Sequence, residues 1–103
     1  MKLQLLILTL FISVLGFSQN KGTITGIITD KDANNQSLPF ANVTLKGTKI
    51  GVNTDIDGKY SISTTPGNYV IQFSFVGYET VEVPVTVKAN ETVTINKSIG
   101  SGS

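Results

Sequence analysis

Strict alternation of apolar and polar residues is the feature that most constrains how this chain folds. A period of two predicts strands with one buried and one exposed face. Two further runs, 22–29 and 49–53, are rich in the residue types that strands favour. Because nothing after residue 18 carries a helical period, the sequence predicts an all-β fold. The alternating segments are 41–45, 60–62, 69–75, 81–87 and 93–99.

Turn-forming residues separate the predicted strands. The polar loop DKDANNQS follows the first strand, and Pro66-Gly67-Asn68 is a strong turn signal. Short strands with turns roughly every 8–12 residues predict a seven-stranded antiparallel β-sandwich. Other connections are expected at 46–48, at 57–58, at 77–78 as a bend, and at 88–91 as a hairpin closure.

Pro84 lies inside the alternating segment 81–87. Because proline has no N–H group to donate to a sheet ladder, this strand is predicted to lie at a sheet edge or to contain a bulge. A proline at an edge also hinders pairing with another chain.

The first eighteen residues have the layout of a secretory signal peptide. Lys2 precedes a nearly continuous apolar run that ends at Leu15, and Gly-Phe-Ser supplies small residues before a predicted cleavage after residue 18. The run is shorter than the roughly 20 apolar residues of a membrane-spanning helix. The sequence therefore predicts an exported chain with one domain at 19–99 and a linker-like Gly-Ser tail at 100–103.

The composition excludes several functional classes. Without Cys or His, the chain cannot build the usual zinc sites, a Ser-His or Cys-His nucleophile pair, or a lipid-anchoring cysteine. Its eight Lys and seven acidic residues become seven of each when Lys2 leaves with the signal peptide, and Arg is absent. A neutral chain without Arg is a poor candidate for nucleic-acid binding. We therefore expect no cofactor, no nucleic-acid partner and no enzymatic activity.

The stretch TDIDGKYSI at 54–62 has two interpretations. Asp55 and Asp57 followed by glycine resemble the start of a calcium loop, but an EF-hand needs an oxygen ligand where Lys59 stands. The favoured interpretation is a turn in which Asp57-Gly58 joins two strands as a hairpin, because glycine adopts positive φ freely.

An irregular calcium site is the weaker interpretation of the same stretch. It would use Asp55 and Asp57 together with a carboxylate from another loop. Asp30 and Asp32 are the candidates for that third ligand.

Five short motifs, which follow one another in a fixed order along the chain, give the sequence a resemblance to one known family. They cover nearly the whole chain after residue 18, and their order and spacing make the resemblance specific. The chain is similar to the carboxypeptidase-regulatory-like (CarboxypepD_reg-like) domain, which implies a transthyretin-like, or prealbumin-like, seven-stranded β-sandwich. The motifs are G-x-I-x-D at 26–30, L-P-x-A-N-V at 38–43, L-K-G-T at 45–48, T-D-x-D-G-x-Y at 54–60 and F-x-G-Y at 75–78.

The resemblance also implies a function. In Bacteroidetes such a domain commonly precedes the plug and barrel of a TonB-dependent, SusC-like outer-membrane receptor for nutrient uptake. The implied role is a non-catalytic accessory domain on the periplasmic side of the outer membrane. Its partner would be the plug and barrel or an associated surface lipoprotein, reached by contacts such as strand addition to an exposed sheet edge.

If the chain stands alone, it is expected to be a secreted carbohydrate-binding or adhesive module. Carbohydrate binding would use the loop aromatics Phe40 and Tyr78, because the strand aromatics fall on inward positions. An adhesive module could lock itself with a Lys–Asn isopeptide bond, for which Lys97 is the candidate because it lies on the apolar phase of the last strand. The simpler interpretation of Lys97 is a strand-end lysine that reaches solvent.

Overall fold

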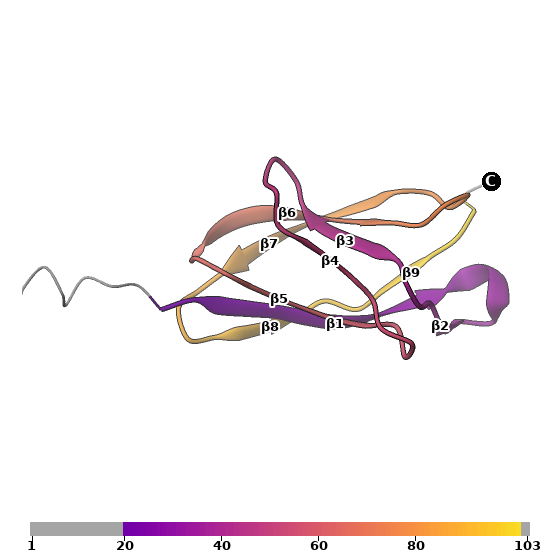
Figure 1. The fold of residues 1–103 in the computed structure, drawn as a ribbon, viewed down its shortest axis with the longest axis horizontal. Coiled ribbons are helices and arrows are strands. Elements are labelled where there is room, and N and C mark those ends of the chain that lie inside the picture. The colour runs from indigo at the N-terminus through magenta and orange to yellow at the C-terminus, as the bar shows by residue number, and fades with distance from the viewer. Residues whose placement is uncertain (1–19, 102–103) are drawn as a thin grey trace, which may run out of the picture.

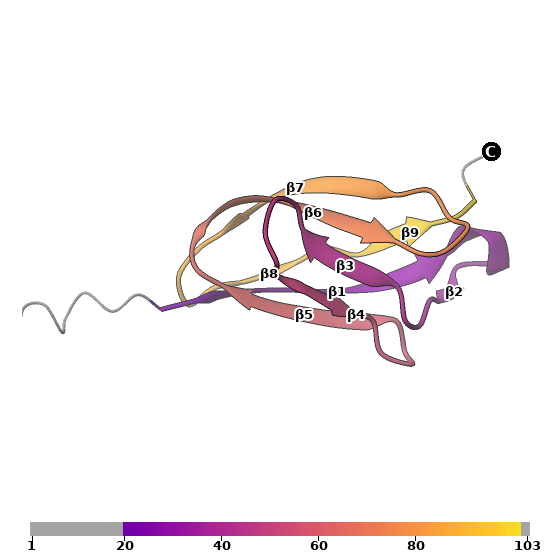
Figure 2. The same cartoon turned by 45° about the horizontal axis from the view of Figure 1, so that its top comes forward.

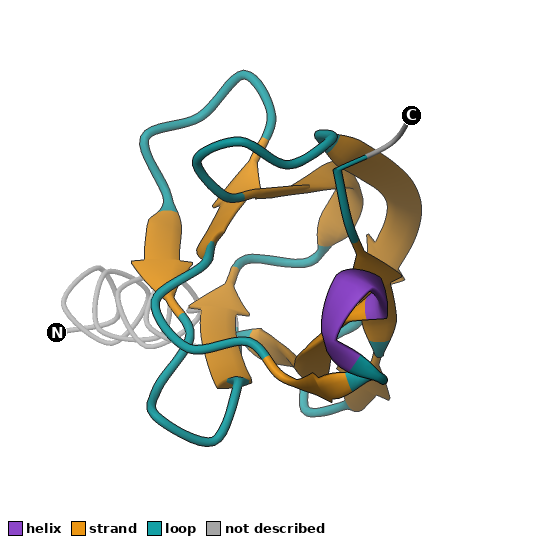
Figure 3. Cartoon of the chain, turned by 90° about the vertical axis from the view of Figure 1, so that its right-hand side faces the viewer, coloured by secondary structure: helices purple, strands orange, loops and turns teal. Residues whose placement is uncertain are grey.

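The computed structural model of the protein describes residues 20–101, which form strands and one short 3₁₀ helix (Figure 1, Figure 3). The predicted signal peptide at 1–18 lies outside the described residues. Within 20–101 no helix is long and apolar enough to cross a membrane. In chain order the elements are β1 (Gly22–Asp30), η1 (Lys31–Ala33), β2 (Gln36–Ser37), β3 (Asn42–Leu45), β4 (Gly51–Asn53), β5 (Lys59–Thr64), β6 (Gly67–Ser74), β7 (Val81–Val87), β8 (Thr92–Thr94) and β9 (Lys97–Ile99).

The strands form two sheets that pack face to face (Figure 2). In the four-stranded sheet the order is β4-β3-β6-β7, and all neighbours are antiparallel. In the five-stranded sheet β1 is central and pairs with β2, β5, β8 and β9. The predicted all-β sandwich is therefore confirmed.

The topology departs from the predicted antiparallel sandwich at β8 and β9, which run parallel to β1. Paired residues are 69 positions apart in both ladders, from Thr23↔Thr92 to Asp30↔Ile99, so β8 and β9 are two parts of one interrupted strand. Nine strand segments are present within 20–101. The predicted number of seven is reached only if β8–β9 counts once and the two-residue β2 is omitted, so it is not confirmed.

The predicted hairpins at 57–58 and 88–91 are wrong. The first connection leads from β4 in one sheet to β5 in the other, and the second leads from β7 to β8, again across the sandwich. Alternation in the flanking strands is the same whether a turn folds a strand back on its neighbour or carries the chain to the opposite sheet. The pattern therefore locates the turn but does not assign its two strands to sheets.

The core lies between the sheets and consists of the inward residues of the alternating segments. β5 follows the pattern strictly, with Tyr60, Ile62 and Thr64 buried and the residues between them exposed. Each fully buried large apolar side chain contributes about 1.5–3 kcal/mol to folding. The core comprises Ile24, Ile28, Leu38, Ala41, Val43, Leu45, Tyr60, Ile62, Ile71, Phe73, Val85, Val87 and Ile99.

β7 lies at the edge of the four-stranded sheet, as Pro84 predicts. Val70 of β6 is the register partner of Pro84, and its carbonyl oxygen accepts a hydrogen bond from the Lys46 N–H on the other side. Because the N–H and C=O of one residue point to the same side of an antiparallel strand, Val70 faces β3 and the ring nitrogen of Pro84 faces the open edge. The missing N–H of Pro84 therefore removes no hydrogen bond between β7 and β6, and it leaves the exposed edge with one hydrogen-bond donor fewer.

The parallel pairing of the first and last strands places the two ends of the domain at opposite ends of the sandwich (Figure 1). We call the end where the chain leaves the exit end. Besides residues 100–101, it carries the loop 38–41, the turn 55–58 and the turn 75–78. The opposite end carries the β3–β4 loop and the β7–β8 connection.

Candidate functional site

The turn of the TDIDGKYSI stretch is organised around the Asp55 carboxylate. Its Oδ1 accepts hydrogen bonds from the backbone N–H groups of Asp57 and Lys59, both at 2.9 Å. The Gly58 N–H donates to the Asp55 carbonyl oxygen at 2.9 Å. Gly58 has φ of +75°, and a Cβ there would lie 2.6 Å from the Ile28 carbonyl oxygen, so both conformation and space require glycine.

Asp30 and Asp32 lie in a second acidic loop at the same end. Asp30 Oδ1 accepts from the Asp32 N–H at 2.9 Å, and its Oδ2 accepts from the Tyr78 hydroxyl at 2.6 Å. Asp32 Oδ2 accepts from the Ser101 N–H at 3.0 Å. Within residues 20–101, no group of three or more His, Cys, Asp or Glu side chains lies close enough together to hold a metal ion.

Tyr78 joins this acidic loop to the turn 75–78. Its hydrogen bond to Asp30 raises the pKa of Tyr78 to about 12, and burial and the negative charges of Asp30 and Asp32 add to the effect. The ring packs edge-to-face on Phe75, with 5.2 Å between centroids. The Glu79 N–H donates to the Gly100 carbonyl oxygen at 2.7 Å, so residues 100–101 are fixed from two sides.

The interruption between β8 and β9 is built by two of the sequence motifs. The Tyr60 hydroxyl donates to the Ile95 carbonyl oxygen at 2.6 Å, and the side-chain oxygen of Asn96 accepts from the Ile27 N–H at 2.9 Å in the place of a main-chain carbonyl. Gly26 lies beneath that carbonyl, where a Cβ would collide with the Ile95 oxygen. Burial raises the pKa of Tyr60 to about 12.

At the exit end Thr54 links the motif that contains Tyr60 to the motif at 38–43. Its hydroxyl donates to the Leu38 carbonyl oxygen at 2.7 Å and accepts from the Ala41 N–H at 2.9 Å, and the side chain is buried. Together with the Gly26–Tyr60 and Asp30–Tyr78 contacts, this bond shows that motif residues pair with one another. Their role in the structure is to hold the sandwich together.

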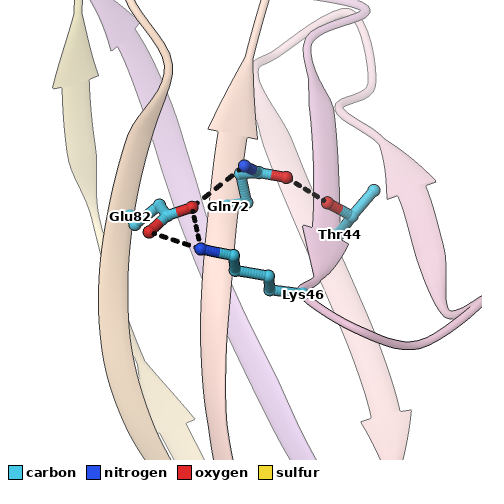
Figure 4. A network of polar contacts seen from close by, with 4 residues as sticks. All are labelled: Thr44, Lys46, Gln72 and Glu82. Atoms are coloured by element: carbon cyan, nitrogen blue, oxygen red, sulfur yellow. Dashed lines mark hydrogen bonds and ion pairs between the residues drawn. The ribbon is translucent and has the colours of Figure 1, made fainter.

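The outer face of the four-stranded sheet carries a polar network across three strands (Figure 4). Lys46 Nζ lies 3.1 Å from Glu82 Oε2, the Gln72 amide donates to the same oxygen at 3.0 Å, and Thr44 reaches Gln72 at 3.5 Å. Such exposed cross-strand contacts contribute about 0.2–1 kcal/mol each. The network stabilises the pairing of β3, β6 and β7.

Exposed apolar side chains gather on the loops of the exit end. Phe40 is 67% exposed, Ile56 75% and Val76 94%. Phe40 adopts φ of +62°, a left-handed conformation that is rare for a bulky residue. Phe40 was a candidate from the sequence. Ile56 and Val76 were not, although each is an apolar residue inside a turn, which is the signal that could have found them.

Lys97, the isopeptide candidate, is half-buried at the start of β9, where it pairs in register with Ile28. Within the described residues it has no ion pair. A shallow groove of about 340 Å³ lies beside the β7–β8 connection. It is lined by Thr86, Lys88, Glu91, Thr92, Val93 and Thr94, with no aromatic residue among them.

Fold and contacts together define a small β-sandwich module, in which the recognisable motifs serve the architecture. The chain belongs to the family of CarboxypepD_reg-like domains, whose sequence profile matches residues 24–101.

The relatives with similar sequences are TonB-dependent receptors that are much longer than this chain. The chain is 38% identical to the TonB-dependent receptor SusC of Bacteroides thetaiotaomicron over 88 aligned residues. This alignment covers 85% of the chain and 8% of SusC. It is 47% identical to a TonB-dependent receptor of Formosa agariphila over 62 aligned residues. This alignment covers 60% of the chain and 6% of that receptor. The chain therefore spans less than a tenth of these relatives.

Solved structures support the fold alone, because their sequence identity is low. A minor pilin of Streptococcus agalactiae superposes with a TM-score of 0.58 at 20% sequence identity. The superposition covers 80% of this chain and 45% of the pilin chain. One chain of a type II cohesin–X-dockerin complex of Acetivibrio cellulolyticus superposes with a TM-score of 0.62 at 19% sequence identity. The superposition covers 76% of this chain and 56% of the chain in the complex.

Proposed function

We propose that this domain is a non-catalytic accessory domain, on the periplasmic side of the outer membrane, of a TonB-dependent receptor for nutrient uptake. The similarity to SusC, which extends over 85% of this chain, carries the proposal. The predicted signal peptide is in keeping with export. The domain acts through protein contacts, with the remainder of the receptor as its first partner.

The chemistry of the described residues supports a non-catalytic role. The carboxylates of Asp30, Asp32 and Asp55 accept hydrogen bonds from nearby backbone or tyrosine groups at exposed turns. General acid–base catalysis needs such groups across a cleft from a substrate. The 340 Å³ groove has Lys88 and Glu91 as its charged lining residues, so a single carboxylate lines it.

The test is the size and location of the polypeptide that carries this domain in its own cell. We expect an epitope tag inserted after the exposed Lys49, in the β3–β4 loop, to leave both sheets intact, because this loop lies outside both strands. We expect the tag in the outer-membrane fraction, in a polypeptide many times larger than the 11.0 kDa of this chain, and protected from protease added to intact cells. A tagged protein of the chain's own mass in the medium would contradict the proposal and favour the free-standing carbohydrate-binding or adhesive module.

A further inference from the structure

An apolar row crosses the exit end of the four-stranded sheet. The β3–β6 ladder ends where Asn42 pairs with Ser74, so the loop 38–41, which carries Phe40, lies beside the turn 75–78, which carries Val76. On its other side the Phe40 N–H donates to the Thr54 carbonyl oxygen at 3.0 Å, next to the turn that carries Ile56. The loop of Phe40 therefore lies between the turns of Ile56 and Val76, and we call these three exposed apolar residues the apolar row.

The backbone at Phe40 is held in a conformation that its side chain does not favour. A φ of +62° costs a bulky residue about 1–2 kcal/mol. The loop is fixed there by the buried Thr54 hydroxyl, which bonds to Leu38 and Ala41 on either side of Phe40. Strain combined with 67% exposure of an aromatic ring indicates a contact outside the domain.

Charge at the exit end is predominantly negative. Exposed carboxylates of Asp55 and Asp57 flank Ile56 directly, and Asp32 and Glu79 lie on the neighbouring loops. The lysines of the same end are Lys31, Lys59 and the half-buried Lys97, so they are outnumbered by these four exposed acids and the half-buried Asp30. The surface therefore suits an occupant with an apolar centre and a rim of Lys or Arg.

The chain leaves the sandwich beside this row. The Ser101 N–H is bonded to Asp32 at 3.0 Å, and the Gly100 carbonyl oxygen accepts from Glu79 at 2.7 Å. A Cβ on Gly100 would lie 2.9 Å from Asp32 Oδ1, so the exit path is closely packed. Any segment that continues the polypeptide therefore follows residues held next to the turn 75–78, which carries Val76.

We infer that the row Ile56–Phe40–Val76 is the docking surface for the segment that follows this domain in a receptor-length polypeptide. This inference rests on the proposed function. Three side chains cover much less than the roughly 1,000 Å² that a stable complex between separate proteins buries. A tethered occupant needs less area, because a short linker gives it an effective concentration in the millimolar range.

The test measures how accessible the row is in both contexts. The chain has no cysteine, so Ile56→Cys and Val76→Cys each introduce one reporter thiol, and Lys49→Cys is the matched control at an exposed site of the opposite end. Maleimide labelling rates are measured on the exported chain by itself, without the predicted signal peptide, and on the receptor-length protein in outer-membrane vesicles. Labelling of the unsubstituted protein is subtracted. We expect labelling at 56 and 76 to be at least about tenfold slower in the receptor-length protein, which corresponds to about 90% docked. Labelling at 49 should be unchanged.

A second substitution tests the role of Phe40. Asn tolerates positive φ, so Phe40→Asn keeps the loop and removes the ring. Combined with Val76→Cys, it should restore fast labelling in the receptor-length protein. Equal rates in both contexts would overturn the docking surface and leave the proposed function standing, whereas a polypeptide of only the chain's own mass would overturn both.

Discussion

At Gly26 the backbone of β1 passes directly under the Ile95 carbonyl oxygen, and a methyl group there has no free space. Because the obstacle is backbone, Gly26→Ala must displace the β8–β9 connection, and we expect a loss of about 3 kcal/mol. Gly47→Ala is the control, since nothing lies within 4 Å of its Cβ and only its φ of +77° opposes the change, which costs about 1 kcal/mol. Urea unfolding of both variants measures the difference, and equal losses would show that the β8–β9 connection yields easily.

Two tyrosines make stability depend on alkaline pH. The pKa values of Tyr60 and Tyr78 are raised to about 12 in the folded protein, from an ordinary value of 10.0. The unfolded chain therefore releases these protons first, so the contribution of the two tyrosines to stability is constant below about pH 10 and falls as the pH rises to 12. We expect the double variant Tyr60→Phe, Tyr78→Phe to weaken this fall, measured as urea midpoints at pH 8 and pH 11. Tyr69→Phe is the control, because hydrogen bonds with Thr64 and Thr65 lower the pKa of Tyr69, and a fall of unchanged size in the double variant would contradict the assignment.

Asp55 and Asp57 are two residues apart and differ in what they do. Asp55→Ala removes the acceptor of two backbone N–H groups, and we expect it to cost about 1 kcal/mol, as the loss of a helix-capping side chain does. Asp57 supplies only its backbone N–H to this turn, so Asp57→Ala should stay within about 0.5 kcal/mol. Thermal unfolding with and without added calcium compares them. A calcium-dependent stability that both substitutions abolish would instead favour the weak calcium site.

Single residues also show how far the sequence predicts contacts. Inward placement of Tyr60 and Phe73 follows from alternation alone, and their rings meet edge-to-face at 5.7 Å between centroids. The hydroxyl of Tyr60 finds the Ile95 carbonyl oxygen 35 positions away. A local sequence pattern cannot predict a contact between residues 35 positions apart, because that contact depends on how the sheets are assembled.

At the scale of strands, periodicity predicted the segments and their buried faces but not their neighbours. Alternation identified β3, β5, β6 and β7 because each buries one face, and Pro84 placed β7 at an edge. The parallel ladder of β1 with β8 and β9 was missed, because alternation is the same in parallel and antiparallel pairs. The exit-end row was missed in part, because apolar residues in turns belong to no strand pattern.

Pro84 and its neighbour Val83 provide a sharp test of the edge. Pro84→Thr restores an N–H that points to solvent, so stability should change by no more than about 0.5 kcal/mol, while the opened edge should increase self-association. Val83→Pro instead removes an N–H that faces β6 and should cost about 3 kcal/mol. Urea unfolding and sedimentation velocity over a range of concentrations measure the two effects. Equal destabilisation by both would show that the assigned strand orientation is wrong.

For the whole molecule, parallel first and last strands make the sandwich an in-line module. The chain enters at one end and leaves at the other, so tension applied to its termini runs along β1 and β8–β9 (Figure 1). Parallel strands pulled from opposite ends slide past each other, and their ladder bonds are loaded together. A receptor domain joined to its neighbours in this way would transmit force before it unfolds.

Single-molecule force spectroscopy tests this geometry by comparing two pulling directions. Pulling through the termini shears six paired positions of β1 with β8 and β9. Cysteine handles at Asn68 and Thr86, which are register partners in β6 and β7, instead open that hairpin pair by pair from one end. Because unzipping loads one ladder bond at a time and forced unfolding follows the unfolding rate, we expect a clearly higher rupture force through the termini. Equal forces in the two directions would show that the β1–β8–β9 ladder is not the mechanical element, and that the interruption at Ile95 and Asn96 yields first.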